Sequence, residues 1–373
     1  MKYYIIAGEK SGDLHASNLI KELKKIDKHA TIRAWGGDEM QRAGAILVKH
    51  YAQMAFMGFW EVVKNIFTIR HFLKECQQDL LAFQPDVLIL VDFAGFNLRM
   101  AKFAKKHHIR VFYYISPKIW AWNPQRAYTI RKYVDKMFVI MHFEKAFYQK
   151  YGMEVDYVGN PLFDAIRQFS PNPRFLEENR LGNKLIIALL PGSRKQELYY
   201  IFPTMLQLAN VLKDNFQFVV AGVKELPSTM YKPALEQGIP VLFDQTYQLL
   251  SYAHAAIVTS GTATLEVALF NVPQVVCYRT SRLTYLLGKQ LIRVPYISLV
   301  NLILGRELVR ELIQDALSIE NLLKALEEIL YHRREEILRG YEEMRNMIRT
   351  ENASQLAAQY MWKYLTQTNE SNG

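Results

Sequence analysis

Strand-length apolar segments alternate with helical segments along most of this 373-residue sequence, and this alternation constrains the fold more than any other feature. Helices are expected at residues 14–25, 97–106 and 126–134. Apolar runs predict strands at residues 3–7, 31–35, 86–92, 110–116 and 136–141. Such an order is typical of a parallel sheet with helices on both faces. The first half of the chain is therefore expected to form an α/β domain.

The same pattern starts again after Gly159-Asn160-Pro161 and the polar stretch at residues 170–184. Strands are predicted at 185–190, 216–222 and 240–243, and a strand–turn–helix–strand unit follows at 256–279. A chain of this length is expected to hold two domains of roughly 100–200 residues each. We therefore expect two doubly wound, Rossmann-like domains, at residues 1–165 and 166–344, with further helices at the C-terminal end.

The composition is that of a globular protein, with half of the residues hydrophobic and 22% charged. No apolar run approaches the ~18 residues that cross a bilayer. The first apolar run is predicted to be a strand and not a signal peptide. The two cysteines lie far apart, so we expect neither a disulfide framework nor a cysteine metal site, and a reducing cytoplasm fits. The histidines lack metal-binding spacing, so no metal is predicted.

The net charge of +10 suits three kinds of partner, namely nucleic acid, anionic lipid and phosphorylated substrates. No nucleic-acid-binding motif occurs, so we expect no nucleic-acid partner. The segment at residues 51–73 is rich in methionine and aromatic residues, and it is either a core helix or a lipid-binding surface. We favour lipid contact because the apolar residues cover more than one helical face. The residues expected to contact lipid are Met57, Phe59, Trp60 and Phe67.

Candidate site residues follow the predicted strands, because ligands of doubly wound sheets bind beyond the carboxyl ends of the strands. Gly8, Glu9 and Asp13 belong to the turn after the first strand. That turn matches neither the dinucleotide nor the Walker pattern, and a capped structural turn is equally compatible with it. Asp92 ends the most apolar strand. Partial desolvation there would raise its pKa and suit a general base, although Asp92 could instead cap the next helix.

Two segments of the second half point to an anion or nucleotide site. Gly192-Ser193-Arg194 follows a strand, and a guanidinium fits a phosphate bidentately, unless Arg194 pairs with Glu197 on the surface. Ser260-Gly261-Thr262 precedes a helix whose first N–H groups suit a polar ligand, and Glu266 could accept ribose hydroxyls. The alternative is a structural turn with Glu266 on the surface. Asn301, among apolar residues, is either a core amide or a ligand contact.

Several of these segments together give the sequence a family resemblance over nearly its whole length. The chain resembles the lipid A disaccharide synthases, which are bacterial glycosyltransferases of family 19 with the two-domain GT-B fold. The matching motifs are AGEKSGD at 7–13, MGFWEVV at 57–63, VDFAGFNLRMAK at 91–102, YYISPKIWAWNPQR at 113–126, VGNPLFD at 158–164, LLPGSRKQE at 189–197, SGTATLE at 260–266 and SLVNLILGRELVRELIQD at 298–315.

The resemblance implies an inverting glycosyl transfer in lipid A (lipopolysaccharide) biosynthesis. The donor would be UDP-2,3-diacylglucosamine and the acceptor 2,3-diacylglucosamine 1-phosphate (lipid X). The products would be a β-1,6-linked lipid A disaccharide 1-phosphate and UDP, and no cofactor is expected. The two domains would face each other across a cleft, with the terminal helices at 345–373 joining the first, acceptor-binding domain. The second domain, residues 166–344, would hold the UDP-sugar.

The resemblance also implies roles for the candidate residues. Asp92 is expected to be the general base, with Glu9 and Asp13 near the transferred sugar. The residues expected to hold UDP are Gly192, Ser193, Arg194, Ser260, Gly261, Thr262, Glu266 and Asn301. The alternatives are another GT-B enzyme, such as a UDP-N-acetylglucosamine 2-epimerase, or a non-catalytic nucleotide-sugar-binding module.

The acylated substrates imply where the protein would work. Both substrates reside in a membrane, so we expect a cytoplasmic protein that associates peripherally with the inner face of the inner membrane of a Gram-negative bacterium. The positive charge and the apolar segment at residues 51–73 supply a physical means of binding this surface. A homodimer is considered as a further partner.

Overall fold

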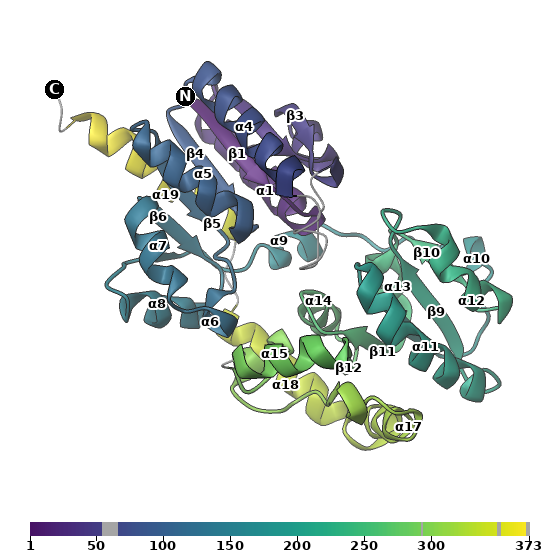
Figure 1. Cartoon of the computed structure of the whole chain (residues 1–373). Helices are drawn as coiled ribbons and strands as arrows, with labels where there is room; N and C mark the ends of the chain where they lie inside the picture. The colour runs from purple at the N-terminus through teal and green to yellow at the C-terminus, as the bar shows by residue number, and fades with distance from the viewer. Residues whose placement is uncertain (54–65, 292–293, 349–351, 371–373) are drawn as a thin grey trace. The chain divides into compact units, whose positions relative to one another are not determined.

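The computed structural model describes residues 1–53, 66–291, 294–348 and 352–370. The chain divides into two compact units (Figure 1). Unit 1 comprises Met1–Asp164 together with Thr350–Gly373, and unit 2 comprises Ala165–Arg349. No helix in the described ranges combines the length and the apolarity needed to cross a membrane.

Unit 1 is built on a seven-stranded parallel sheet with strand order β3-β2-β1-β4-β5-β6-β7. All five residues of β4 are buried, because helices cover both faces of the sheet. Its strands are β1 (Lys2–Ala7), β2 (Thr31–Gly36), β3 (Ile46–His50), β4 (Val87–Val91), β5 (Arg110–Tyr114), β6 (Lys136–Val139) and β7 (Asp156–Tyr157).

Alternate residues of the unit 1 strands point into two separate cores, as the two-residue period of a strand requires. Tyr3 and Ile5 face the core beneath α1 (Lys10–Ile26) and α19 (Ala353–Glu370). Tyr4 faces the opposite core, beneath α4 (Ile66–Phe83), α5 (Ala94–Lys106), α7 (Arg126–Tyr133) and α8 (His142–Gln149). The shorter helices of this unit are α2 (Asp38–Arg42), α6 (Ile119–Trp122) and η1 (Tyr51–Gln53), and α9 (Leu162–Arg167) leads into unit 2.

The last helix, α19, belongs to the core of unit 1 although it ends the chain. It packs along α1 and buries Ala357, Met361 and Leu365 there. Its first turn is stabilised by Asp164, whose carboxylate accepts the N–H of Ser354 at 2.9 Å. The N-terminal unit is therefore completed by the C-terminal segment.

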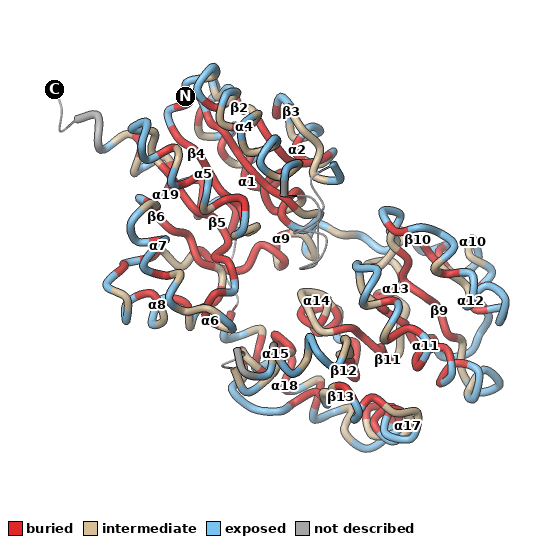
Figure 2. The backbone as a smooth tube through the Cα atoms, viewed as in Figure 1, coloured by how far each residue is buried: buried red, intermediate tan, exposed pale blue. Residues whose placement is uncertain are grey.

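Unit 2 is built on a six-stranded parallel sheet with strand order β10-β9-β8-β11-β12-β13. In both units the buried residues concentrate in the strands and the exposed ones on the outer sides of the helices (Figure 2). The strands of unit 2 are β8 (Ile186–Leu190), β9 (Gln217–Gly222), β10 (Val241–Phe243), β11 (Ala253–Thr259), β12 (Gln274–Tyr278) and β13 (Glu311–Ile313).

The helices of unit 2 cover both faces of this sheet, as in unit 1. They are α10 (Phe175–Glu178), α11 (Lys195–Leu212), α12 (Lys232–Glu236), α13 (Thr246–Tyr252), α14 (Ala263–Leu269), α15 (Arg282–Leu291), α16 (Leu299–Leu304), α17 (Ile319–Glu327) and α18 (Arg334–Ile348), with shorter turns η2 (Ser228–Tyr231), η3 (Gln314–Ala316) and η4 (Glu328–His332).

Both sheets reverse their strand order at one position, which confirms the predicted doubly wound α/β class. In unit 1 the order turns back between β1 and β4, and in unit 2 between β8 and β11. Ligands of doubly wound sheets bind beyond the carboxyl ends of the strands at such a switch point. A ligand-binding site is therefore expected at the segments that follow these four strands.

We predict that Met361→Ala destabilises unit 1. The side chain is fully buried between α19 and the sheet, and truncation of a buried methionine lowers the free energy of unfolding by about 2–5 kcal/mol. All five tryptophans belong to unit 1, so the urea midpoint read from tryptophan fluorescence reports this unit. Lys363→Ala, at an exposed position of the same helix, is the control. Equal midpoints for the two variants would show that α19 does not stabilise the unit.

Candidate functional site

The candidate residues of the first half lie at the switch point of unit 1. Ala7 of β1 pairs with Val91 of β4, so the turn that begins at Gly8 and the turn that begins at Asp92 start side by side. A Cβ atom at Gly8 would lie 2.2 Å from the Phe93 ring. Only glycine allows the two turns to approach so closely.

Three residues with positive φ angles follow the neighbouring strands β4 and β5. Asp92 and Phe93 have φ angles of 44° and 48°, and Ile115, after the neighbouring strand β5, has φ of 63°. Positive φ is unfavourable for residues with a side chain, above all for a β-branched one. Such conformations persist where the surrounding structure holds them, and they cluster at functional sites.

Hydrogen bonds hold Asp92 in this conformation. Its N–H donates to the carbonyl oxygens of Tyr114 and Ile115, both at 3.3 Å. Its own carbonyl oxygen accepts the hydroxyl of Tyr113 and, at 2.8 Å, the side-chain amide of Asn97. Helix α5 begins after Phe93, which is its N-cap residue and makes no capping bond with its own side chain. The backbone is thus fixed at the edge of the sheet where a base is expected.

Aromatic rings support the same turn from the side of the core. The Phe93 ring stacks on Phe96 with centroids 5.9 Å apart, and Phe96 stacks on Trp35 at the same spacing. Trp35 is fully buried in β2. The position of the β4–α5 turn is therefore set by the packing of three rings, in addition to its hydrogen bonds.

Asp13 is buried and holds a neighbouring turn. One carboxylate oxygen accepts the N–H groups of Gly37 and Met40 at 2.8 and 3.1 Å, and the other accepts that of Glu39 at 3.1 Å. Burial raises the pKa of Asp13, while these three bonds act to lower it. Glu9 is half-buried and immediately precedes α1. Asp13 therefore positions the turn between β2 and α2, whereas Glu9 lies closer to the carboxyl end of β1.

A buried carboxyl group, Glu144, supports the loop after β5 and was not among the predicted residues. It accepts the indole N–H of Trp120 at 3.1 Å and the N–H groups of Ile140 and Met141 at 3.2 and 3.0 Å. Burial raises its pKa to about 7. Glu144 lies at the N3 position of α8, where a capping-box glutamate stands. Because Met141 stands in place of the Ser or Thr of that motif, the sequence carries no clear signal for it.

The Gly192-Ser193-Arg194 segment lies at the switch point of unit 2 and is closed by Glu197. This carboxylate accepts the N–H groups of Ser193 and Arg194 at 2.9 and 3.1 Å, and it lies 3.5 Å from the Arg194 guanidinium. The pairing considered as an alternative is therefore present. The Arg194 side chain is nevertheless 53% exposed, so its guanidinium can still meet an anion.

The Ser260-Gly261-Thr262 turn follows the other strand of this switch point. The Ser260 hydroxyl donates to the carbonyl oxygen of Ile297, and the Thr264 hydroxyl donates to that of Gly261, both at 2.8 Å. A Cβ atom at Gly261 would meet no atom within 4 Å. The turn is therefore anchored by its hydroxyl groups, while space remains beside its glycine.

Glu266 and Asn301 differ in how much of their hydrogen-bonding capacity the protein uses. Glu266 accepts the hydroxyl of Tyr247 at 2.8 Å, and burial raises its pKa. Asn301 is buried, and its amide donates to Val309 and Glu311 and accepts from Leu308 and Val309, at 2.8–3.0 Å. These four bonds use both N–H donors and both lone pairs of the asparagine side chain. Asn301 therefore corresponds to the core-amide alternative and positions the loop after α16.

The remaining predictions concern lipid contact and metal. Met57, Phe59 and Trp60 lie outside the described residues, whereas Phe67, in the first turn of α4, is 78% exposed. Within the described ranges, no three His, Cys, Asp or Glu side chains gather in a way that could hold a metal ion.

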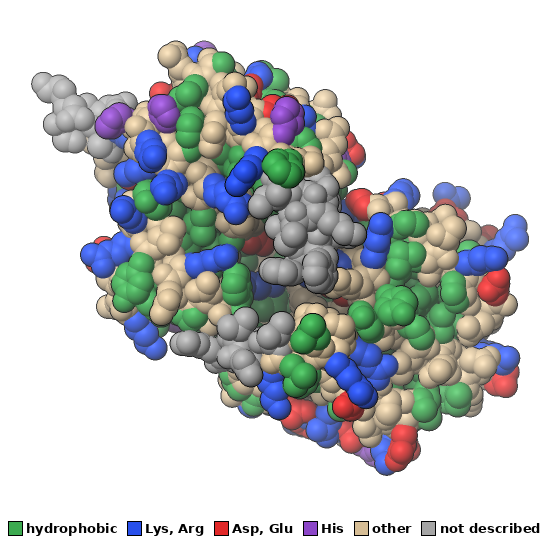
Figure 3. Space-filling model, in the orientation of Figure 1, with side chains coloured by type: hydrophobic (Ala, Val, Ile, Leu, Met, Phe, Trp, Pro, Cys, Tyr) green, Lys and Arg blue, Asp and Glu red, His purple; other side chains and the backbone are tan. Residues whose placement is uncertain are grey.

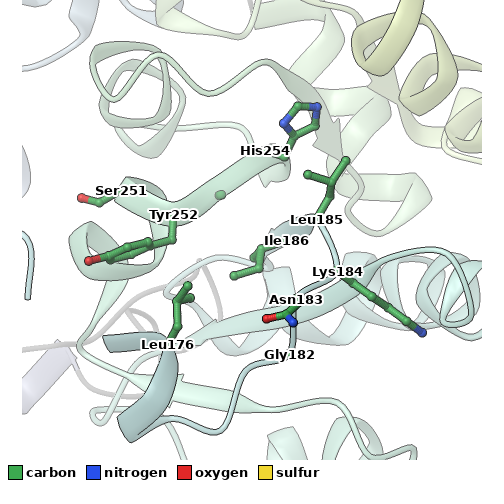
Figure 4. Close-up of a pocket in the computed structure, with 10 residues that line it drawn as sticks. Leu176, Gly182, Asn183, Lys184, Leu185, Ile186, Ser251, Tyr252 and His254 are labelled. Atoms are coloured by element: carbon green, nitrogen blue, oxygen red, sulfur yellow. The ribbon is translucent and has the colours of Figure 1, made fainter. Parts of the chain in front are cut away.

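A cavity of about 380 Å³ opens in unit 2, beside the amino ends of the strands and not beside their carboxyl ends (Figure 4). Its walls include Ile186 at the start of β8 and Ala253 at the start of β11, together with Tyr252 and His254. The amino ends of these strands lie opposite the Arg194 and Ser260 turns. The cavity is therefore separate from the switch-point residues of unit 2.

Comparison with known proteins gives one consistent family. A family model described as lipid-A-disaccharide synthetase matches residues 3–363. The lipid-A-disaccharide synthase of Syntrophus aciditrophicus is 38% identical over 357 residues, covering 89% of this chain and 92% of that protein. That of Geobacter sulfurreducens is 37% identical over 325 residues, covering 85% of each chain.

A solved structure resembles the chain in fold. The UDP-GlcNAc 2-epimerase of Neisseria meningitidis, bound to UDP-GlcNAc, has a TM-score of 0.67 at 15% sequence identity and covers 97% of this chain and 100% of its own. At this identity the likeness extends to the fold alone.

We predict that Glu144 makes the stability of unit 1 depend on pH. The folded protein holds the proton of the Glu144 carboxyl group more tightly than the unfolded chain does. The stabilisation that this protonated group gives to the folded state is therefore complete below the ordinary pKa of 4.5 and is lost as pH rises through about 7. The free energy of unfolding should fall by up to about 1.4 kcal/mol per pH unit in that window. Tryptophan fluorescence in urea measures it.

Glu144→Gln should remove this component of the pH dependence, and Glu154→Gln, at an exposed position, should keep it. The comparison of slopes between wild type and variant cancels the titration of all other groups. Parallel slopes for the wild type and Glu144→Gln would refute the prediction.

Proposed function

Since the chain belongs to the lipid-A-disaccharide synthetase family, whose activity is a glycosyl transfer in lipid A biosynthesis, we propose how its residues divide that reaction. The proposed donor is UDP-2,3-diacylglucosamine, and the proposed acceptor is 2,3-diacylglucosamine 1-phosphate. Unit 1 supplies the base and the acceptor contacts, and unit 2 binds the UDP group. The observation that carries this division is that candidate residues follow the strands at the switch point of each sheet.

Asp92 is proposed as the general base of a single in-line displacement. It takes the proton of the acceptor's 6-hydroxyl as that oxygen attacks the anomeric carbon of the donor, and the configuration inverts. Support comes from the backbone of Asp92, which is held at positive φ by bonds from Tyr113 and Asn97. Asp13 acts by positioning the adjacent turn, and Glu9 contacts the transferred sugar.

Arg194 is proposed to stabilise the charge that develops on the leaving diphosphate. Glu197 already accepts the N–H groups of Ser193 and Arg194, so the diphosphate meets the exposed guanidinium and not those N–H groups. The backbone N–H groups of the Ser260-Gly261-Thr262 turn offer further donors. Charge stabilisation of this kind is among the largest contributions an enzyme makes to rate.

Glu266 is proposed to bind the ribose hydroxyls of UDP. Tyr247 donates its hydroxyl to one carboxylate oxygen of Glu266, which leaves the second oxygen to accept from a ligand. The Tyr247 ring packs against Phe169 and Phe270, with centroids 5.6 and 5.1 Å away. The tyrosine therefore keeps the carboxylate in a defined orientation.

We predict that Asp92→Asn lowers the turnover number for disaccharide formation by about 10²- to 10⁴-fold, the usual contribution of a general base. Both substrates should be saturating, so that the measurement reports the chemical step. Asp86→Asn is the matched control, because Asp86 precedes the opposite, amino end of the same strand. Near-normal turnover of the Asp92 variant would remove Asp92 as the base.

Contact with a membrane surface is proposed because both substrates carry acyl chains. Helix α15 presents Leu283 and Leu286, which are 69% and 61% exposed and three residues apart, so they share one helical face. Arg282 and Lys289 flank them on the same helix. Lys and Arg side chains are also spread over the face of the molecule shown in Figure 3. An apolar face flanked by cations suits anionic lipid.

We predict that the protein floats with anionic liposomes at low salt, and that the double variant Leu283→Ser/Leu286→Ser binds them roughly tenfold less tightly, because buried leucines supply much of such binding. Leu235→Ser, which changes an exposed leucine on α12, is the control. Recovery of the wild type at the bottom of the gradient, away from the liposomes, would contradict the proposal.

A further inference from the structure

We propose that Arg99 and Arg126, brought together by helices α5 and α7 of unit 1, bind the phosphate group of the acceptor. This inference rests on the proposed function, because it takes a phosphorylated acceptor sugar as the ligand of unit 1. It adds a subsite that recognises the phosphate end of that sugar.

The fold brings the two arginines to one place. Arg126 opens α7, Arg99 lies in α5, and the two helices pack side by side over the same core (Figure 1). The Arg126 guanidinium lies over the indole of Trp122, with its Cζ atom 4.4 Å from the ring centroid. Arg99 donates to the carbonyl oxygen of Gly95 at 3.1 Å. These contacts orient both side chains without neutralising them.

The described residues leave the charges of Arg99 and Arg126 without a counterion. Within the described ranges, neither guanidinium has a carboxylate at ion-pair distance, whereas Lys105 on the same helix α5 pairs with Asp135. Partial burial and then the charge of Arg99 lower the pKa of Arg126. Arg126 is half-buried and Arg99 is exposed. Like charges near each other repel, and a bound anion relieves this repulsion.

The surroundings indicate which anion would bind. The hydroxyl of Tyr113 donates to the carbonyl oxygen of Asp92. Burial raises the pKa of Tyr113 most, the charge of Asp92 raises it further, and the charge of Arg126 lowers it. The subsite therefore adjoins the proposed base. In the acceptor, the phosphate is on C1 and the carbon that bears the attacking 6-hydroxyl is attached to C5. These two ring carbons flank the ring oxygen, so a single acceptor can present its phosphate to the arginines and its hydroxyl to the base.

The chemistry of the subsite also fits a phosphomonoester on a sugar. Guanidinium groups bind phosphate oxygens through paired N–H bonds. Trp122 is 41% exposed and offers an apolar surface to the sugar ring beside the charge. The donor diphosphate has its own proposed cation, Arg194 of unit 2, so the anion expected on unit 1 is that of the acceptor.

The test compares two acceptors that differ only in the phosphate, 2,3-diacylglucosamine 1-phosphate and 2,3-diacylglucosamine. We expect the wild type to prefer the first. Arg126→Met and Arg99→Met should each lower kcat/KM for the phosphorylated acceptor by roughly 10- to 100-fold, the effect of losing a charged hydrogen bond. For the acceptor without phosphate, kcat/KM should be unchanged. Arg126→Lys should retain part of the preference.

Lys106→Met is the control, since it removes an exposed charge from the same helix and should leave the preference intact. Equal losses on both acceptors, or a wild type indifferent to the phosphate, would overturn the subsite while the proposed function stands. Competition by inorganic phosphate against the phosphorylated acceptor provides a check that needs no variant, and its absence would count against the subsite. A wild type that glycosylates neither acceptor would overturn the function itself.

Discussion

Burial of the central strands on both faces is the constraint on which the rest of the structure depends. β4 and β8 are entirely buried, so neither can carry a polar side chain along its length. The first place where the chain can expose one is beyond the last residue of the strand. Parallel pairing then directs all of these ends to the same edge of each sheet. The burial that stabilises a sheet therefore also gathers Asp92 in unit 1, and Arg194 and Ser260 in unit 2, at its edge.

In each unit, a side chain packs closely against a glycine in the turn after the first strand of the sheet, but the side chain differs between the units. Gly8 and Gly192 both follow the first strand of their sheet at its switch point. A Cβ atom would lie 2.2 Å from the Phe93 ring in one case and 2.2 Å from the Glu197 carboxylate in the other. The first turn is thus held by an apolar ring and the second by a carboxylate. In both turns glycine is required, because a neighbouring side chain occupies the space that a Cβ atom would fill.

The sequence predicts the doubly wound fold well where strands are buried and poorly where they are not. β3, β7 and β13 were not predicted, and all three lie at sheet edges and are only partly buried, so their apolar pattern is weak. The switch-point segments could be named from the sequence because they follow central strands. The partners of Asp13 and Asn301, and the contact of Glu144 with Trp120, could not, since they depend on hydrogen bonds between separate turns. The positive φ angles of Asp92 and Phe93 could not be predicted either, because neither residue is a glycine. The catalytic roles remain predictions.

The docking of α19 on α1 has a consequence for how the protein is made. Translation runs from the N-terminus, so the ribosome completes α1 and the sheet of unit 1 long before it reaches residues 353–370. Until then α1 lacks the packing that α19 gives it, and all of unit 2 is synthesised in the interval. Domains at the N-terminus usually fold first during synthesis. Here the packing of the N-terminal unit can be completed only after residues 353–370 have been synthesised, and therefore after the whole of unit 2.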